Sequence, residues 1–151
     1  ALVSWFIEKN QVDNSIIEKA ERTARVVRST LLNSTFGLLM EKGLPPSTVT
    51  DYTMSFRANA LMIHSFIDLF EITGNLTYFN WAYELYSNIE KNLRDNTNGF
   101  FYNSIGQNED KNKGIAGFGL YIRSLDFLSK KVFSPAPREA ELLPARHTST
   151  F

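Results

Sequence analysis

The feature that most constrains the fold is a pair of apolar segments within residues 60–93. The segment 60–72 is apolar on nearly every side of a helix, and the segment 76–93 is apolar on one side only. A helix that is apolar all round must be buried, whereas a one-sided helix covers a core and faces water. Gly74 between them suits the left-handed end of a helix. We therefore expect an inner and an outer helix joined as an antiparallel hairpin.

Helical spacing of apolar residues recurs elsewhere in the chain. Ser15 and Glu18 form a capping-box pattern, and Thr50 or Asp51 could cap the inner helix. The expected helices span residues 1–9, 15–32, 50–73, 76–93 and 115–130, with short extended segments at 38–40 and 100–102 and a charged loop at 106–113. Residues 134–151 show no sustained period, so we expect them to form an irregular tail.

Composition excludes several partners. A chain of 151 residues with 43% hydrophobic residues is one domain's worth of material. Its 16 basic and 16 acidic side chains balance, so no net charge attracts nucleic acid or anionic lipid. No apolar run approaches the roughly 20 residues that span a bilayer, so we expect no membrane partner. The absence of cysteine fits a reducing, cytoplasmic setting, and with only two histidines we expect no metal and no cofactor.

A shift of 62 residues places the first predicted helical pair on the second without gaps. The matched positions include Asp13 and Asn75, Ala20 and Ala82, Val27 and Ile89, and Gly37 and Gly99. The segment 124–128 echoes 65–69 at a spacing of 59 and begins a third copy. Such self-similarity is typical of stacked hairpins. We therefore predict an all-α fold of tandem antiparallel helical hairpins over residues 1–133, followed by the tail 134–151.

Three phrases follow one another in an order that resembles a known architecture. They are Leu69–Asn75, Trp81–Leu85 and Asn98–Tyr102. Together they resemble the α/α toroid, or six-hairpin glycosidase-like, superfamily, and within it the helical portion of the thioredoxin-domain-containing, spermatogenesis-associated family. The resemblance covers roughly residues 1–133. It implies a partial α/α toroid of carbohydrate-active type, with a carbohydrate as the expected ligand.

Two departures from that family limit what the resemblance implies. A complete toroid of the superfamily has six hairpins, whereas this chain has about two and a half, so we expect it to be part of a longer sequence. The acidic pair with tyrosine at the start of an inner helix is represented only by Thr50, Asp51 and Tyr52. We therefore expect no complete catalytic centre in this chain alone.

The candidate ligand-binding residues gather near the start of the inner helix, where loops of a toroid surround the open end of its cavity. Asp51, Arg57 and Asn59 could hold sugar hydroxyls, with Tyr52 or Tyr102 stacking on a sugar ring. The alternative interpretation is structural. In it, Asp51 caps the helix and Arg57 pairs with a neighbour.

His64 is a further candidate, because an imidazole on an inner helix could act as an acid or base in a central cavity. A single histidine among apolar residues is more often a hydrogen-bonded core residue. Asp68 and Asp126 occupy matching places in two repeats and suggest a pair of carboxylates, as in glycoside hydrolysis. The alternative is that each carboxylate satisfies a neighbouring helix.

Three functions remain open from the sequence. The first is a part of a carbohydrate-active toroid protein. The second is a helical-repeat module that binds other proteins, or itself, through exposed inner helices. The third is a terpenoid-type cavity, which ranks last because no aspartate-rich metal motif is present. Polar side chains converging on a pocket would favour the first function, and a broad apolar face without a pocket would favour the second.

Overall fold

The computed structural model of the chain describes residues 13–44 and 48–132. Four helices form most of it, and they are α2 (Asn14–Leu31), α3 (Phe56–Thr73), α4 (Leu76–Asn92) and α5 (Phe118–Val132). These correspond to four of the predicted helices. The predicted helix over residues 1–9 and the predicted tail over 134–151 lie outside the described residues, so both stay predictions.

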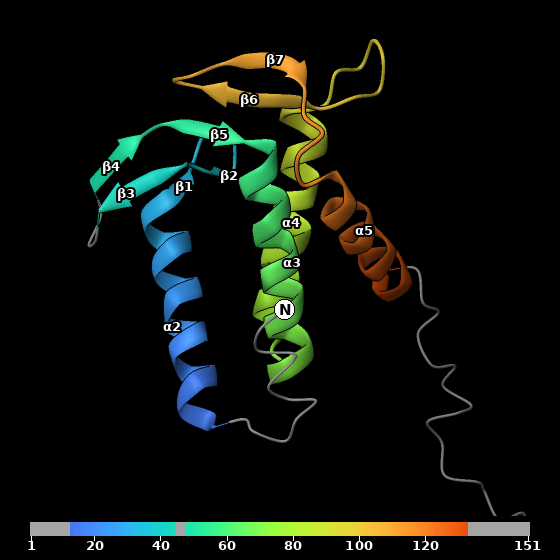
Figure 1. The fold of residues 1–151 in the computed structure, drawn as a ribbon. Helices are drawn as coiled ribbons and strands as arrows, with labels where there is room; N and C mark the ends of the chain where they lie inside the picture. The colour runs from blue at the N-terminus through green and yellow to red at the C-terminus, as the bar shows by residue number, and fades with distance from the viewer. Residues whose placement is uncertain (1–12, 45–47, 133–151) are drawn as a thin grey trace, which may run out of the picture.

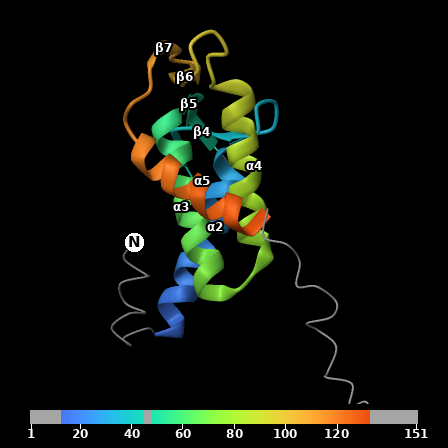
Figure 2. The same cartoon turned by 90° about the vertical axis from the view of Figure 1, so that its right-hand side faces the viewer.

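The antiparallel hairpin of α3 and α4 forms the centre of the fold (Figure 1). Helix α3 ends at Gly74, which has a φ of 68° and donates its backbone N–H to the Phe70 carbonyl at 2.8 Å. Helix α4 begins two residues later, at Leu76, and its cap is Asn75, whose side chain accepts a hydrogen bond from the Thr77 N–H. Figure 2 shows α5 lying across this hairpin, where the Tyr121 hydroxyl donates to the Glu90 carboxylate of α4 at 2.6 Å.

Helix α3 is the more buried of the two central helices, as its sequence predicts, although it keeps an exposed stripe that includes Leu61 at 41% exposure. Helix α4 buries one row of residues and presents its other sides to water; that row is Tyr78, Ala82, Leu85 and Ile89. Helix α3 buries residues in every turn from Phe56 to Leu69. Phe56 is fully buried and stacks on Phe101, with 4.8 Å between the ring centroids. Tyr121 of α5 meets the same ring edge-on at 5.3 Å, so one aromatic cluster joins α3, α5 and the segment between α4 and α5.

The all-α prediction is wrong, because the described part of the chain also contains seven short strands in three antiparallel sheets. The first sheet pairs β1 (Leu32–Asn33) with β2 (Leu38–Leu39), and the second pairs β3 (Lys42–Leu44) with β4 (Thr48–Asp51). The third contains β5 (Thr53–Ser55), β6 (Tyr102–Gly106) and β7 (Asp110–Lys113). The inner helix accordingly begins at Phe56 rather than near residue 50.

The strands form because both long connections lie at the same end of the helices, where their backbones satisfy one another (Figure 1). Strand β5 precedes α3, strand β6 precedes α5 by a dozen residues, and the two pair with Met54 opposite Ile105. Strand β6 also pairs with β7, with Ser104 opposite Asp110. The connection 41–53 is closed at its base, since the Glu41 N–H donates to the Thr53 carbonyl at 2.8 Å.

The 62-residue correspondence is visible in backbone hydrogen bonds. Gly37 and Gly99 have φ angles of 65° and 76°, and each donates its N–H to the carbonyl four residues earlier. The Met40 N–H donates to Leu31 at 2.9 Å, and the Tyr102 N–H donates to Leu93 at 2.8 Å. The pairing of Leu32 with Leu39 recurs as a bridge between Arg94 and Phe101. The same tight turn therefore follows α2 and α4.

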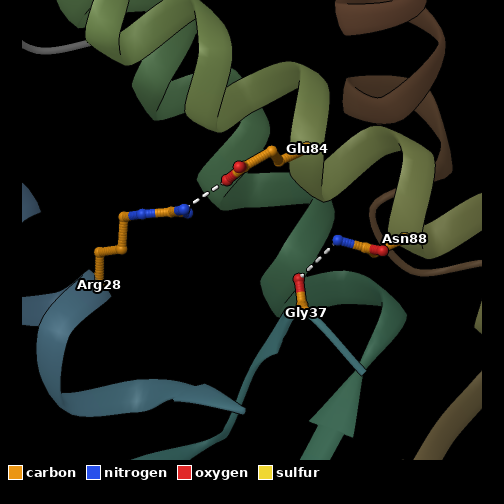
Figure 3. A network of polar contacts seen from close by, with 4 residues as sticks. All are labelled: Arg28, Gly37, Glu84 and Asn88. Atoms are coloured by element: carbon orange, nitrogen blue, oxygen red, sulfur yellow. Dashed lines mark hydrogen bonds and ion pairs between the residues drawn. The ribbon is translucent and has the colours of Figure 1, made fainter. Parts of the chain in front are cut away.

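Helix α4 also holds the turn that follows α2 (Figure 3). The Asn88 side-chain amide donates to the Gly37 carbonyl at 3.2 Å, and the Asn92 amide donates to the Phe36 carbonyl at 3.0 Å. An ion pair between Arg28 and Glu84 links the same two helices nearby. These side chains fix α2 and its turn against α4.

The buried amide of Asn59 connects the first turn of α3 to the connection before it. Its Oδ1 accepts the Leu39 N–H at 2.8 Å, and its Nδ2 donates to the Leu39 carbonyl at 3.0 Å and to the Ser55 carbonyl at 2.9 Å. The side chain is 0% exposed. Strand β2 pairs with β1 along one edge, and the Asn59 amide satisfies the backbone N–H and carbonyl of Leu39 in place of a second strand.

We predict that Asn59→Ala lowers the free energy of unfolding by about 3 kcal/mol, because it leaves the buried N–H and carbonyl of Leu39 without partners. Denaturant unfolding monitored by circular dichroism measures the change. Asn80→Ala is the matched control, since Asn80 is exposed on α4, and we expect its cost to stay below about 0.5 kcal/mol. A loss below about 1 kcal/mol for Asn59→Ala would contradict this role.

Candidate functional site

A polar cleft of about 680 Å³ opens beside the N-terminal end of α3. We call it the polar cleft. Its walls come from β5, the first turn of α3, the β6–β7 hairpin and Ala116. The lining residues are Glu41, Thr53, Ser55, Arg57, Asn103, Ser104, Gln107, Asn108, Glu109, Asp110 and Ala116. Almost all of them carry hydrogen-bonding side chains, so the cleft suits a polar ligand.

The alternation of side chains along β5 places two hydroxyl groups in the polar cleft. Thr53 and Ser55 lie on one face of β5, while Met54 between them is buried on the other face. Ser104 lies opposite Ser55 in the sheet and donates its hydroxyl to the Asn108 carbonyl at 2.7 Å. The Asn108 amide in turn donates to the Thr53 hydroxyl at 3.0 Å. The hydroxyls are therefore held in place by the hairpin that faces them.

Asp110 is the carboxylate that the cleft holds most firmly. Its Oδ2 accepts a hydrogen bond from the Asn103 amide at 2.9 Å, and its Oδ1 accepts the Asn112 N–H at 2.9 Å. These bonds, with the Asn103 amide first, lower the pKa of Asp110 below its ordinary value. Asp110 therefore stays ionised well into the acidic range and acts as an acceptor in the cleft.

The charges of the cleft are mixed. Arg57 is its one basic lining residue, and it stands with Glu41, Glu109 and Asp110. Glu109 is paired with Lys111 at 3.0 Å. A guanidinium, ionised carboxylates and hydroxyls together offer both donors and acceptors, which is what the hydroxyl groups of a sugar require.

The residues predicted around this end are only partly brought together. Arg57 lines the polar cleft. Asp51 ends β4 and accepts the Thr53 N–H at 2.9 Å, which closes a turn. Hydrogen bonding by the Thr53 side chain, and then by this N–H, lowers the pKa of Asp51. The alternative that it caps the helix is wrong, because Ser55 caps α3 by accepting the Ala58 N–H. Asn59 lies in the core behind the cleft, with its amide bonded to backbone groups.

The two candidate tyrosines lie near the cleft without lining it. Tyr52 is 54% exposed, and its backbone N–H donates to the Gln107 side chain at 3.1 Å. Tyr102 is half-buried on β6, and the Lys111 ammonium lies 6.0 Å from its ring centroid. An exposed ring such as that of Tyr52 offers an apolar face beside polar groups.

His64 lies elsewhere, in a second cleft of about 240 Å³ between α3 and α5. Its Nε2 lies 3.9 Å from an Asp68 carboxylate oxygen on the next turn of α3. Asp126 of α5 lines the same cleft and is paired with Lys130 at 2.7 Å. The structure therefore brings the two matched aspartates to one cleft, with the histidine beside them and apart from Arg57.

Sequence reasoning missed most of the polar cleft. Residues 106–113 were expected to be a charged loop, whereas 110–113 form β7 and Asp110 lines the cleft. Thr53, Ser55 and Ser104 were not singled out, because a short strand with single hydroxyl residues carries no motif. The Asn103 and Asp110 pair could have been suspected from an amide and a carboxylate that flank a tight turn.

Gly117 sets how closely α5 approaches the polar cleft. It has a φ of 88°, and a Cβ atom there would lie 3.2 Å from the Arg57 Cα and 3.6 Å from the Ala60 Cβ. Glycine is therefore needed both for the backbone conformation and for the contact with α3. The first turn of α5 is held against the helix that carries Arg57.

Comparison with known proteins adds the fold class. No protein-family model and no curated protein matches the chain. A D-mannose isomerase crystal structure superposes with a TM-score of 0.67 at 20% identity, over 82% of this chain and 35% of that one. A sugar epimerase from a ruminal bacterium superposes with a TM-score of 0.59 at 13% identity, over 82% of this chain and 32% of that one. The chain thus spans about a third of each.

These two sugar enzymes belong to the α/α toroid superfamily, and at these identities the likeness shows the fold alone, which is toroid-like. Nothing in the comparisons supports the finer likeness to the thioredoxin-domain-containing family.

Within residues 13–44 and 48–132, no helix combines the length and apolar character needed to cross a membrane. The same residues contain no cluster of three or more histidine or acidic side chains that could hold a metal ion.

We predict that Gly117→Ala lowers the free energy of unfolding by about 2 kcal/mol, because alanine is strained at a positive φ and would press on Arg57. Gly119→Ala is the matched control, since a Cβ at Gly119 meets no atom within 4 Å. We expect this control to leave stability unchanged or to raise it by up to about 1 kcal/mol, because Gly119 lies within α5. Equal effects of the two substitutions in thermal unfolding would contradict the close contact.

We predict that Asn103→Ala raises the pKa of Asp110 toward its ordinary value, as followed by carboxyl carbon chemical shifts during acid titration. Because the pKa of Asp110 is lowered in the folded state, its contribution to stability is present above the pKa of the unfolded chain. That contribution is lost as the pH falls through the folded value, below about pH 4. Asn103→Ala should therefore weaken the pH dependence of unfolding in that range. Asn96→Ala, an exposed control, should leave the titration of Asp110 unchanged.

Proposed function

We propose that this chain is the part of a carbohydrate-active α/α-toroid protein that contributes one wall of a sugar-binding site. The polar cleft at the N-terminal end of α3 carries the proposal. It gathers hydroxyl, amide, carboxylate and guanidinium groups from both long connections at one end of the helices. The superposition on a D-mannose isomerase and a sugar epimerase supports a sugar as the class of ligand.

In this proposal Arg57 and Asp110 hold sugar hydroxyls from opposite walls. Arg57 supplies donors and the ionised Asp110 supplies acceptors, while the exposed Tyr52 ring offers a face for an apolar patch of the sugar. Asn59 and Asp51 keep the walls in place rather than contacting the ligand. We retain His64, with Asp68 beside it, as a candidate for proton transfer, because an imidazole next to a carboxylate is suited to that task.

We further propose that the chain alone has no complete catalytic centre. The polar cleft has no histidine in its lining, and the His64 cleft is a separate cavity with different walls. The chain spans about a third of each sugar enzyme that it superposes on. Turnover therefore requires groups beyond those that the two clefts supply.

A protein-binding function has one observation in its favour. Leu61 of α3 and Phe118 and Ile122 of α5 are each at least 41% exposed, which is unusual for helices that otherwise form a core. Self-association through these helices stays a prediction. The convergence of polar groups on a cleft favours sugar binding as the primary function. The balanced charge of the chain favours a protein without a nucleic-acid partner, and its lack of cysteine favours a cytoplasmic one.

We predict weak, saturable binding of D-mannose or a related neutral hexose to the isolated chain, measured by ligand-observed NMR. Arg57→Ala should weaken it about tenfold, because charge-assisted hydrogen bonds contribute about 1.5–3 kcal/mol. The matched control is Arg22→Ala, an exposed arginine of α2 that lines neither cleft. We expect no isomerase or epimerase turnover. Unchanged affinity in Arg57→Ala would contradict the assignment, and turnover by this chain would contradict the incomplete centre.

A further inference from the structure

A third cavity lies between α2 and α4 and shares no residue with either cleft. It has a volume of about 410 Å³ and is lined by Arg25, Arg28, Ser29, Leu32 and Trp81. We call it the arginine pocket. Two guanidinium groups and an indole ring in one cavity are unexpected for a purely structural seam between helices, because like charges three residues apart on a helix repel each other.

The Arg28 side chain is held tightly but is not fully satisfied. Its guanidinium carbon lies 4.9 Å from the centre of the Trp81 ring, a cation–π contact, and its Nη2 is paired with Glu84. Its Nη1 is buried and has no hydrogen-bond partner, and it is the one buried side-chain nitrogen or oxygen of the described residues in that state. An unsatisfied buried donor of a charged group destabilises the folded state, because it has lost its hydrogen bonds to water without gaining others.

The other guanidinium is less engaged. Arg25 is exposed on α2, and its Nη1 donates to the Tyr78 hydroxyl at a long distance of 3.3 Å. The Tyr78 hydroxyl donates in turn to Glu21 at 2.8 Å. Arg25 therefore keeps most of its donors available on the open side of the pocket.

We propose that the arginine pocket binds a phosphate group, either as the free ion or as a phosphate monoester. A dianion matches two guanidinium groups in charge, and its oxygens accept from both at once. Its third and fourth oxygens, or an ester substituent, face the open side of the pocket. A single carboxylate would leave one of the two cations without a partner.

Glu84 is the internal competitor for this site. The Glu84 side chain is 56% exposed, whereas that of Arg28 is 17% exposed, so their ion pair lies at the edge of the pocket. Because the Glu84 end of the pair faces water, releasing this carboxylate costs less than releasing a buried one, since water can solvate it. Arg28 then turns its Nη1 toward the pocket, and the phosphate replaces the carboxylate while satisfying the donor that was unpaired.

The test follows Trp81 fluorescence in a Trp5→Phe background, because Trp5 and Trp81 are the two tryptophans of the chain. Inorganic phosphate and glucose 6-phosphate are titrated separately at constant ionic strength, with sodium chloride as the reference. We expect a saturable change with phosphate and none with chloride. Tighter binding of the ester identifies a monoester as the natural ligand, and equal or weaker binding identifies the free ion.

Two variants with opposite expected effects and one control variant make the assignment falsifiable. Arg25→Gln, which leaves the Arg28 and Trp81 contact intact, should weaken phosphate binding at least tenfold, and Glu84→Gln should strengthen it severalfold. Arg22→Gln, on the same helix outside the pocket, should bind as the parent does. Absence of a saturable response in the parent, an unchanged affinity in Arg25→Gln, or weaker binding in Glu84→Gln would each overturn the proposal. None of these outcomes depends on whether the polar cleft binds a sugar.

Discussion

The fold depends on the three hydrogen bonds of the Asn59 amide. This side chain sits at the first turn of α3, and it bonds both backbone groups of Leu39 in the preceding connection and the carbonyl of Ser55. Strand β2, which follows the turn after α2, is thereby fixed to the helix that carries Arg57. Because the amide is buried, water cannot replace these bonds, so one residue keeps β2 against the first turn of α3.

The helices could be predicted from the sequence because their signals are local. Apolar residues at 3.6-residue spacing and the glycine at position 74 each act within one or two turns. The capping box predicted at Ser15 and Glu18 is misplaced, because Asp13 caps α2 by accepting the Ser15 N–H at 2.9 Å. The strands could not be predicted in the same way. Met54 pairs with Ile105, about fifty residues away, and no property of a three-residue strand reveals such a partner. The 62-residue offset correctly related the glycine turns at Gly37 and Gly99. It gave no sign that β6, which follows the second turn, pairs with β5.

The candidate residues taken from the sequence and the polar cleft lie at the same end of the inner helix, but the two sets share few residues. Arg57 lines the polar cleft. Asn59 was a candidate for the same reason, its polar side chain, but that side chain is bonded to the backbone of Leu39. A polar residue near the start of a helix can point into the cleft or toward the core. The position of the neighbouring strands decides between these two directions. Thr53, Ser104 and Asp110 become functional candidates through the pairing of β5 with β6 and β7, which depends on tertiary structure.

The bond between the Glu41 N–H and the Thr53 carbonyl brings the two ends of the connection 41–53 together before the chain reaches α3. Strands β3 and β4 consequently form an appendage whose length is independent of the spacing between the helices, because both of its ends are anchored at one point. Evolution or an engineer could extend or shorten this appendage and so build a longer rim at the end of the helices where the polar cleft lies. The helices beneath would keep their packing.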